Sequence, residues 1–231
     1  MKKRAMILVP LFAMLVVLFL ASCKGAAGNN GPTGSSGLSV MTFQDGVSPS
    51  NAYAGTTDTD LISGADASTN YGTLTIATAG SQSSGGGNFM LFRPLYRFDI
   101  STVVPSNITI QKAYLTITLT SYIAKTYNVY ALTKVWTETQ ATWNVSATGI
   151  NWTTPGGDYT TLEDSEASTS TTITFSLNPS LVQSWITTPS TNYGLLLKDT
   201  DETAGTFANI NTRESSTAAS RPKLTIYYSL P

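Results

Sequence analysis

The sequence reads AYLTITLT from Ala113 to Thr120. Leu115, Ile117 and Leu119 alternate there with threonines. A period of two places the apolar side chains on one face of a β-strand and the threonines on the other. Threonine is β-branched, which favours an extended backbone. The stretch therefore predicts a central strand of an antiparallel sheet with one buried face and one solvated face.

Further short strands are expected on both sides of this stretch. Segments bounded by turn residues with strand-like composition cover residues 40–44, 58–63, 73–78, 89–99, 108–122, 127–134, 171–177, 193–198, 206–211 and 222–228. Pro94 falls inside one of them, which indicates a sheet edge, a bulge or a break into two strands. Residues 80–88 and 147–167 are poor in aliphatic side chains, and we expect both segments to be loops.

One short helix is expected after the strand at 171–177. Asn178 is a suitable helix cap, and Pro179 suits the first helical position. Leu181 and Trp185 are four residues apart, which places them on the same side of a helix over residues 179–187. About ten short strands with one small helix predict an all-β fold, namely a jelly-roll β-sandwich.

The N-terminal segment is typical of an export signal. Basic residues at positions 2–4 precede a continuous apolar run, which ends in the letters LASC at Cys23. These four letters resemble the lipobox of bacterial lipoproteins, in which the cysteine carries the acyl chains. We therefore expect residues 1–22 to be a signal peptide and Cys23 to be lipidated. An uncleaved signal anchor, or ordinary cleavage that leaves a free thiol, are the alternatives.

The predicted export places the protein in the cell envelope, anchored to a membrane by lipid, or outside the cell. Residues 23–39 are rich in Gly, Ser and Asn and predict a flexible tether, so we expect the folded domain to span residues 40–231. Three of the 13 basic residues lie in the signal, which leaves ten against 14 acidic residues. This balance gives no general attraction to nucleic acid. The chain has a single cysteine, so no disulfide forms within it, and we expect a monomer.

The chain contains no histidine. This excludes Ser-His-Asp and Cys-His catalysis and any zinc or iron site built on histidine. Carboxylate chemistry, tyrosine acting with arginine, or binding alone remain. Glycoside hydrolysis needs two acids about 5–10 Å apart, and the candidates are Glu138, Asp158, Glu163, Asp164 and Glu166. A structural role is favoured for Glu138, and a solvated loop for Asp164 and Glu166.

Several short motifs occur in an order that resembles a known family. They are Asp58-Thr59-Asp60, Asn70-Tyr71-Gly72, Arg97-Phe98-Asp99-Ile100, Ile110 to Leu115, Trp136-Thr137-Glu138, Thr142-Trp143-Asn144, Val182 to Trp185, Asn192-Tyr193-Gly194, Arg213-Glu214 and Arg221 to Leu224. Together they resemble the DNRLRE-type domain, also grouped as carbohydrate-binding module family 96, over residues 58–228. The resemblance implies a jelly-roll module that binds polysaccharide, with alginate as the attested ligand. Thr212 stands where the family often has serine.

Aromatic side chains are the candidates for stacking on sugar rings. Trp152 lies in a polar segment close to Tyr159 and is the tryptophan that core packing explains least. We take these two residues as ligand-binding candidates, with Trp152 exposed at the binding surface. Trp185 is expected in the core, and Trp136 and Trp143 are expected to act as lids over it.

A uronate polymer would require a local basic patch, because the domain as a whole is acidic. Arg93, Arg97 and Lys112 are the residues that we expect to supply it. A structural alternative stands beside this one, since Arg97 and Asp99 lie on one strand face and can form an ion pair. An isolated charge on an edge strand can also serve only to discourage aggregation.

A structural calcium ion is the one cofactor that we consider. Jelly-roll modules often carry such an ion, and calcium prefers carboxylates and backbone oxygens as ligands. The candidate ligands are Asp58, Asp60, Asp99 and Asp158. Their spacing does not match that of an EF-hand.

We therefore expect a non-catalytic polysaccharide-binding module, displayed as an exported lipoprotein and suited to acidic glycans such as alginate. The first alternative is a structural or adhesive module of the cell surface whose partner is a protein. The second is a polysaccharide hydrolase or lyase. A groove with an aromatic ring and several polar groups favours polysaccharide binding, whereas a flat apolar patch favours a protein partner.

Overall fold

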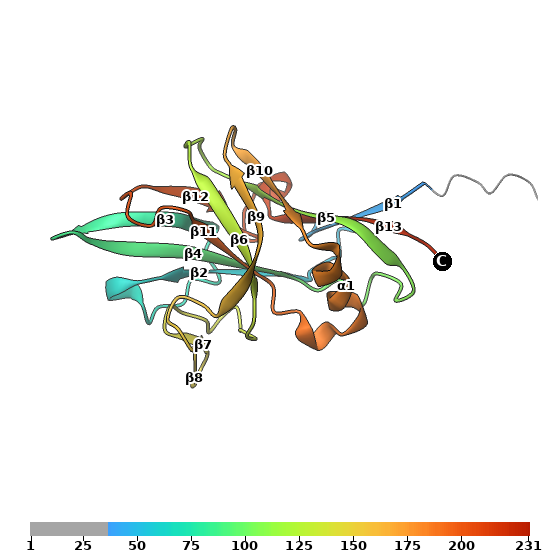
Figure 1. The fold of residues 1–231 in the computed structure, drawn as a ribbon, viewed down its shortest axis with the longest axis horizontal. Coiled ribbons are helices and arrows are strands. Elements are labelled where there is room, and N and C mark those ends of the chain that lie inside the picture. Colours follow the sequence, from blue (N-terminus) through green and yellow to red (C-terminus); the bar gives the residue numbers. More distant parts are fainter. Residues whose placement is uncertain (1–36) are drawn as a thin grey trace, which may run out of the picture. The chain divides into compact units, whose positions relative to one another are not determined.

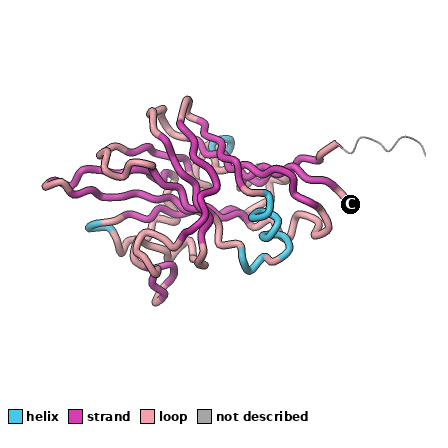
Figure 2. Tube along the Cα trace, in the orientation of Figure 1, coloured by secondary structure: helices cyan, strands magenta, loops and turns pink. Residues whose placement is uncertain are grey.

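Residues 37–231 are described by the computed structural model. The predicted signal peptide, Cys23 and most of the predicted tether therefore lie outside the described residues. No helix within the described part is long and apolar enough to cross a membrane. Figure 2 shows that strands and loops make up nearly all of this part, with helical turns in a few short places. The all-β expectation is confirmed.

The chain order of the elements is as follows. The strands are β1 (Ser39–Gln44), β2 (Thr56–Ile62), β3 (Ile76–Gly85), β4 (Asn88–Phe98), β5 (Thr109–Thr118), β6 (Thr126–Leu132), β7 (Val145–Ala147), β8 (Ile150–Asn151), β9 (Tyr159–Ala167), β10 (Thr172–Leu177), β11 (Leu195–Asp199), β12 (Phe207–Asn211) and β13 (Lys223–Ser229). The helical segments are η1 (Gly64–Asp66), α1 (Pro179–Thr187), η2 (Pro189–Thr191) and η3 (Ala218–Ser220). The helix α1 has the bounds that the sequence predicts.

The strands form two main antiparallel sheets, which we call the small sheet and the large sheet. The small sheet has the order β1-β13-β5-β10, and the stretch at 113–120 supplies most of its strand β5. The large sheet has the order β12-β3-β4-β11-β6-β9, with β2 paired to β4. The hairpin β7–β8 is separate from both sheets and lies apart from β5 and β13 in Figure 1. This arrangement is a β-sandwich with one attached hairpin.

The two faces of the large sheet pack into different hydrophobic clusters. Phe98 and Leu197 point into the inner cluster, where they meet small-sheet residues such as Phe175. Leu95 lies three residues before Phe98 on β4, and Leu196 is next to Leu197 on β11; both point into the outer cluster. Because successive side chains in a strand alternate between faces, β4 and β11 are buried on both sides. The inner cluster is the core of the sandwich.

Strand β4 is continuous through Pro94, but its partners change there. Strand β3 pairs with β4 as far as Phe92, and β11 pairs with Leu95 and Tyr96. On the opposite edge, β2 runs past Pro94 without interruption. Proline has no N–H to donate, so it fits the point where one neighbour ends and the next has not begun. The sequence predicted an edge, a bulge or a break at Pro94. In the structure, the neighbour of β4 on this side changes there from β3 to β11.

Two segments predicted as loops contain strands. Residues 80–88 form the end of β3, a glycine turn and the start of β4, because Gly85, Gly86 and Gly87 all have positive φ angles that other residues rarely adopt. Residues 147–167 include β8 and the long strand β9, which pairs with β6. Strand β9 is polar and largely exposed, so it lacks the apolar alternation by which a half-buried strand is recognised.

Candidate functional site

A groove of about 730 Å³ lies where the outer face of the large sheet meets the chain between β6 and β9. Strand β4 supplies one wall through Arg93, and Tyr159 enters from the first position of β9. The remaining lining residues are Thr133, Lys134, Thr153, Thr154, Pro155, Gly157 and Asp158. We call this hollow the β6–β9 groove. It brings together three sequence candidates, namely Arg93, Asp158 and Tyr159.

Arg93 is bound by the protein itself. Its Nε and Nη2 donate to the two carboxylate oxygens of Glu202 at 2.7 and 2.8 Å, and its Nη1 donates to Gly156 O at 3.0 Å. The guanidinium also packs over the Trp143 ring, 4.8 Å from the ring centre. With a buried side chain and three hydrogen bonds, Arg93 shapes the wall and offers few free donors to a ligand.

Two lysines that were not predicted as site residues provide accessible positive charge, one lining the groove (Lys134) and one beside it (Lys198). Lys134 donates to Asn151 O, and its Nζ lies 3.7 Å from Asp158 Oδ2. Lys198 comes from β11, and its Nζ lies 3.2 Å from Glu202 Oε2. Both side chains remain about a quarter exposed, at 28% and 25%. Lys198 follows three buried leucines, which show no alternation. The direction of its side chain therefore becomes clear only from the position of β11 in the large sheet.

Tyr159 is the aromatic side chain that lines the groove. Its ring is half-buried, and its centre lies 4.7 Å from that of Tyr130 on β6. The Lys198 ammonium lies 3.4 Å from the Tyr159 hydroxyl. The ring is therefore held from one side by Tyr130 and fixed at its polar end by Lys198. A ring held in this way is suited to stacking against the apolar face of a sugar.

Trp152 is not exposed, so the expectation of an accessible ring at the binding surface is wrong. The side chain is buried in the outer cluster with Trp136, and its Nε1 donates to Thr142 O at 2.8 Å. This segment was predicted to be a loop, but the β7–β8 hairpin folds it onto the outer face of the large sheet. Trp136 and Trp185 are buried as expected, and Trp143 is half-buried.

The three predicted cations do not form one patch. Arg93 and Arg97 both lie on β4, but they face different hollows, since Arg97 lines a second one of about 420 Å³. Lys112 is exposed on β5 of the small sheet, close to Tyr114. The basic patch expected from Arg93, Arg97 and Lys112 is therefore divided among three places.

The four predicted calcium ligands do not form one group of carboxylates among residues 37–231. Asp60 accepts from the Thr78 amide at 2.8 Å, and Asp99 accepts from the Ser101 amide at 3.2 Å. Asp158 accepts from backbone amides within its own loop. Each of these carboxylates is thus oriented by a different neighbour, and Asp58 alone belongs to a cluster of acids.

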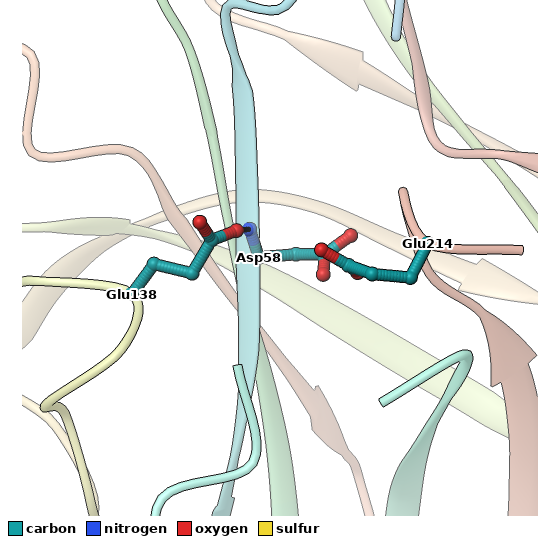
Figure 3. A group of neighbouring side chains, drawn as sticks. All are labelled: Asp58, Glu138 and Glu214. Carbon is teal, nitrogen blue, oxygen red and sulfur yellow. Dashed lines mark hydrogen bonds between the residues drawn. The ribbon is translucent and has the colours of Figure 1, made fainter. Parts of the chain in front are cut away.

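Asp58 meets Glu138 and Glu214, and one carboxylate oxygen from each lies within 4.8 Å of the others (Figure 3). Three carboxylates are a chemically suitable donor set for calcium. Arg213, however, already donates to both oxygens of Glu138, at 2.6 and 2.9 Å, and lies 2.9 Å from Glu214 Oε1. An ion at this cluster would compete with the guanidinium, so calcium remains a prediction.

Burial governs the electrostatics of this acidic cluster. Burial raises the pKa of Asp58 well above its ordinary value, and the neighbouring charge of Glu214 raises it further. Burial also raises the pKa of Glu214, although Arg213 opposes that shift. Burial opposes the charge of Arg213, but the hydrogen bond from its side chain to Glu138 raises its pKa overall. The guanidinium is therefore the fixed cation that keeps these acids together.

Motifs from distant parts of the sequence converge on this cluster. Asn70 Nδ2 donates to the backbone oxygens of Glu138 and Ala141, both at 2.7 Å. Gly72 passes so close to Glu138 O that a Cβ atom there would collide with it. Asp58 N donates to Glu138 Oε1 at 2.9 Å. The short motifs at 58–60, 70–72, 136–138 and 213–214 thus build one structural node that joins loops to the large sheet.

Comparison with known proteins adds one positive finding. The chain matches carbohydrate-binding module family 96 over residues 49–228, which is most of its length and nearly all of the described domain. No curated protein matches the chain. The matched range covers both sheets from β2 onward, the β6–β9 groove and the acidic node. The chain therefore belongs to carbohydrate-binding module family 96.

Proposed function

We propose that the domain binds polysaccharide in the β6–β9 groove without changing it chemically, and that it favours acidic glycans such as alginate. The observation that carries this proposal is the pairing of a held aromatic ring, Tyr159, with two partly exposed lysines. Lys134 lines the groove, and Lys198 lies beside it, in contact with the Tyr159 hydroxyl. Membership of a carbohydrate-binding module family supports the general class of ligand.

The groove offers the two kinds of contact that a sugar needs. Tyr159 presents an aromatic ring for the axial C–H groups of a pyranose. Thr133, Thr153 and Thr154 line the same hollow and carry hydroxyl groups that can donate to or accept from sugar hydroxyls. An apolar surface combined with a few placed polar groups is the usual composition of a small-ligand site.

The charges in and around the groove favour an acidic glycan. Arg93, Lys134 and Lys198 supply three positive charges, whereas Asp158 and Glu202 supply two negative ones. Lysine has a flexible stem and three donors, so Lys134 and Lys198 can turn from these carboxylates toward a uronate. The excess of positive charge is local, because the chain as a whole carries more acidic than basic residues.

The composition of the groove argues against glycoside hydrolysis. That reaction requires two opposed carboxyl groups, one of them an acid whose pKa is raised. Asp158 is the one carboxylate among the residues that line the groove. Although partial burial opposes the shift, hydrogen bonds from the amides of Thr153 and Thr154 lower its pKa. Asp158 is therefore ionised at neutral pH and suited to orienting hydroxyls, not to donating a proton.

We further propose that the domain is displayed on the cell envelope as a lipoprotein. The support is the N-terminal sequence, in which a basic start and an apolar run end at Cys23. Lipid attachment at Cys23 would hold the groove at the surface where polysaccharides are met. Metabolic labelling with an alkyne-bearing fatty acid tests this step, and labelling that persists in Cys23→Ser contradicts it.

Affinity-gel retardation and calorimetry with polyuronates and neutral glycans test the binding proposal. We expect Tyr159→Ala to lower the affinity of the preferred glycan about tenfold, which corresponds to about 1.4 kcal/mol. Tyr227→Ala is the matched control, since Tyr227 is also a half-buried tyrosine but lies on the small sheet beside Tyr114. We expect it to leave the affinity unchanged.

Three results would contradict the proposal. Wild-type protein that is retarded by no glycan would remove polysaccharide as the ligand. Loss of binding in Tyr227→Ala but not in Tyr159→Ala would move the site to the small sheet. Release of new reducing ends from a polymer by the wild-type protein would show catalysis.

A further inference from the structure

Arg97 differs from the other arginines of the described chain. Arg93 and Arg213 form ion pairs with carboxylates, and Arg221 donates to the backbone oxygens of Ser215 and Asp45. Within residues 37–231, the Arg97 side chain makes a single hydrogen bond, from Nη1 to Trp136 O at 3.2 Å, and no ion pair. A guanidinium has five N–H donors, so most of those of Arg97 are not used by the protein.

The unpaired guanidinium is nevertheless held in position. Its Cζ lies 5.0 Å above the Trp136 ring. Trp136 is buried, and its Nε1 donates to Tyr193 O at 2.8 Å, so the ring is fixed beneath the arginine. Stacking of this kind orients the plane of a guanidinium and leaves its edge free to form paired hydrogen bonds. Burial lowers the pKa of Arg97, which reflects the cost of keeping its charge there.

Arg97 faces a defined hollow of about 420 Å³, which we call the Arg97 hollow. Its other lining residues are Ala54, Gly55, Thr57, Asp99, Ser101, Val135, Pro189, Ser190 and Asn192. Two polar atoms of these residues, Thr57 Oγ1 and Asn192 Oδ1, are buried and have no hydrogen-bond partner among residues 37–231. The Asn192 amide is oriented, because its Nδ2 donates to Phe98 O at 2.8 Å. Because both atoms are buried, the Arg97 guanidinium is the group of this hollow whose unused donors a ligand can meet.

The two acids nearest to Arg97 are turned toward other groups. Asp99 lines the hollow, but its Oδ1 accepts from the Ser101 amide and hydroxyl at 3.2 and 2.9 Å. Glu138 is bound through both oxygens by Arg213. Their charges favour the charged form of Arg97 without making contact with it. The ion pair predicted between Arg97 and Asp99 is therefore absent from the described residues, and the guanidinium edge remains available.

We propose that the Arg97 hollow is a second binding site, which accepts the carboxylate group of an acidic sugar through paired hydrogen bonds from Arg97. The site deepens the polysaccharide binding proposed above and rests on it. The segment between β6 and β7 links the two hollows, since Lys134 lines the β6–β9 groove and Val135 lines the Arg97 hollow. One polymer chain that follows this segment would reach both sites.

Calorimetry on the full chain tests the proposal with four probes. Sodium D-glucuronate carries a free carboxylate whereas its methyl ester is uncharged, and a polyuronate and a neutral glycan give the corresponding contrast of charge at polymer length. We expect Arg97→Gln to lower the polyuronate affinity about tenfold or more and to leave that of the neutral glycan unchanged. Lys112→Gln removes one exposed positive charge from the small sheet and is expected to change neither affinity.

Arg97→Lys separates charge from geometry. Lysine keeps the positive charge but lacks the planar fork of donors, so we expect an intermediate loss of polyuronate affinity. Should either variant fold poorly, the wild-type protein offers a direct measurement. The Nε–Hε resonance of Arg97 is expected to shift on titration with glucuronate and to stay in place with its methyl ester. The monosaccharide and polymer probes together distinguish a site for a free sugar acid from a site that needs a chain.

The outcomes are separable from those of the proposed function. If the wild-type protein binds polyuronate and Arg97→Gln binds it equally well, the second site is wrong and the groove proposal stands. An equal loss for acidic and neutral glycans in Arg97→Gln would also overturn the carboxylate site. If no polymer binds, but glucuronate shifts the Arg97 resonance, the function proposed for the groove fails while the carboxylate site is supported.

Discussion

The two faces of the large sheet are covered in different ways. The inner face packs against the small sheet through aliphatic and phenylalanine side chains such as Phe98, Phe175 and Leu197. The outer face is covered by the chain that follows β6, which brings Trp136 and Trp152 onto Leu196. Arg93 and Arg97 lie against the outer tryptophans Trp143 and Trp136, whereas among residues 37–231 no arginine lies over Trp185, the tryptophan of the inner cluster.

This difference indicates which face can recognise a ligand. Aliphatic packing between two sheets leaves no polar group available, and its contribution is to stability. The outer layer combines aromatic rings with guanidinium and ammonium groups, and both the β6–β9 groove and the Arg97 hollow open at its border. Rigid strands beneath a layer of loops are a common arrangement for a binding site.

Removing a large side chain from the inner face should have the largest effect on stability. Phe175 is fully buried between the sheets. We expect Phe175→Ala to lower the free energy of unfolding by about 3–5 kcal/mol, because it leaves a cavity in a close-packed core. Urea denaturation followed by tryptophan fluorescence measures the change. Phe207→Ala is the control, since Phe207 is 39% exposed and should cost much less. Equal costs would mean that the inner face is not the principal core.

A glycine substitution tests the outer face separately. Gly156 has a φ of +90°, and a Cβ there would lie 2.7 Å from both Arg93 Nη1 and Trp143 Cη2. We expect Gly156→Ala to destabilise the domain by about 1–3 kcal/mol through backbone strain and displacement of Arg93, and to weaken glycan binding. Gly149→Ala is the matched control, because Gly149 has a φ of +75° but nothing within 4 Å of the added Cβ.

The paired glycine variants separate strain from collision. Both carry the cost of a positive φ, and only Gly156→Ala disturbs the wall of the groove. Thermal unfolding and glycan calorimetry on the two proteins give the comparison. If Gly149→Ala weakens glycan binding as much as Gly156→Ala does, the wall formed by Arg93 and Trp143 is not part of the site.

The titration of a buried acid should give the smallest of the three effects when it is measured over one pH unit. Burial raises the pKa of Asp60 well above the usual 3.8. The native state therefore binds more protons than the unfolded chain in the interval between 3.8 and the raised pKa. The free energy of unfolding is therefore highest, as far as Asp60 is concerned, below that interval. It falls as the pH rises through the interval, by at most about 1.4 kcal/mol per pH unit for one proton.

Asp60→Asn should flatten this dependence. Its amide oxygen can still accept from the Thr78 amide, but the side chain no longer ionises. Urea denaturation between pH 4 and pH 8 measures the slope in the two proteins. Asp201→Asn is the control, because hydrogen bonds from Thr203 lower the pKa of this exposed acid and its titration lies below the range. An unchanged slope in Asp60→Asn would assign the pH dependence to other groups such as Asp58.

The inner face was predictable from the sequence, and most of the outer face was not. The alternation of apolar and polar residues in β5 and β10 predicts which side chains are buried. Asn178 predicts the start of α1, and its side chain does accept a hydrogen bond from Ser180 N. Strand β9 has no such alternation, because polar side chains are tolerated along its exposed length. The position of Trp152 depends on a hairpin whose two strands hold only five residues, which no periodic pattern reveals.

The candidate site was harder to predict, because it is formed by contacts between residues that are distant in the sequence. Tyr159 and Arg93 were selected for their chemistry and do line one groove. Lys134 and Lys198 were not predicted, because no feature of the neighbouring sequence distinguishes a lysine beside a groove from any other surface lysine. For Arg97, the absence of an ion pair is the informative feature, and it follows from how Asp99 turns toward Ser101.

The pairing of β1 has a mechanical consequence. β1 is the edge strand of the small sheet and pairs only with β13, with Ser39 opposite Tyr228. Tension applied to the chain before Ser39 would act first on the β1–β13 pairing and would break its hydrogen bonds in sequence, starting at Ser39 and Tyr228. The β6–β9 groove lies on the other sheet. If the domain is anchored and binds a polymer as proposed, tension between the two would separate β1 from β13 before it deformed the β6–β9 groove.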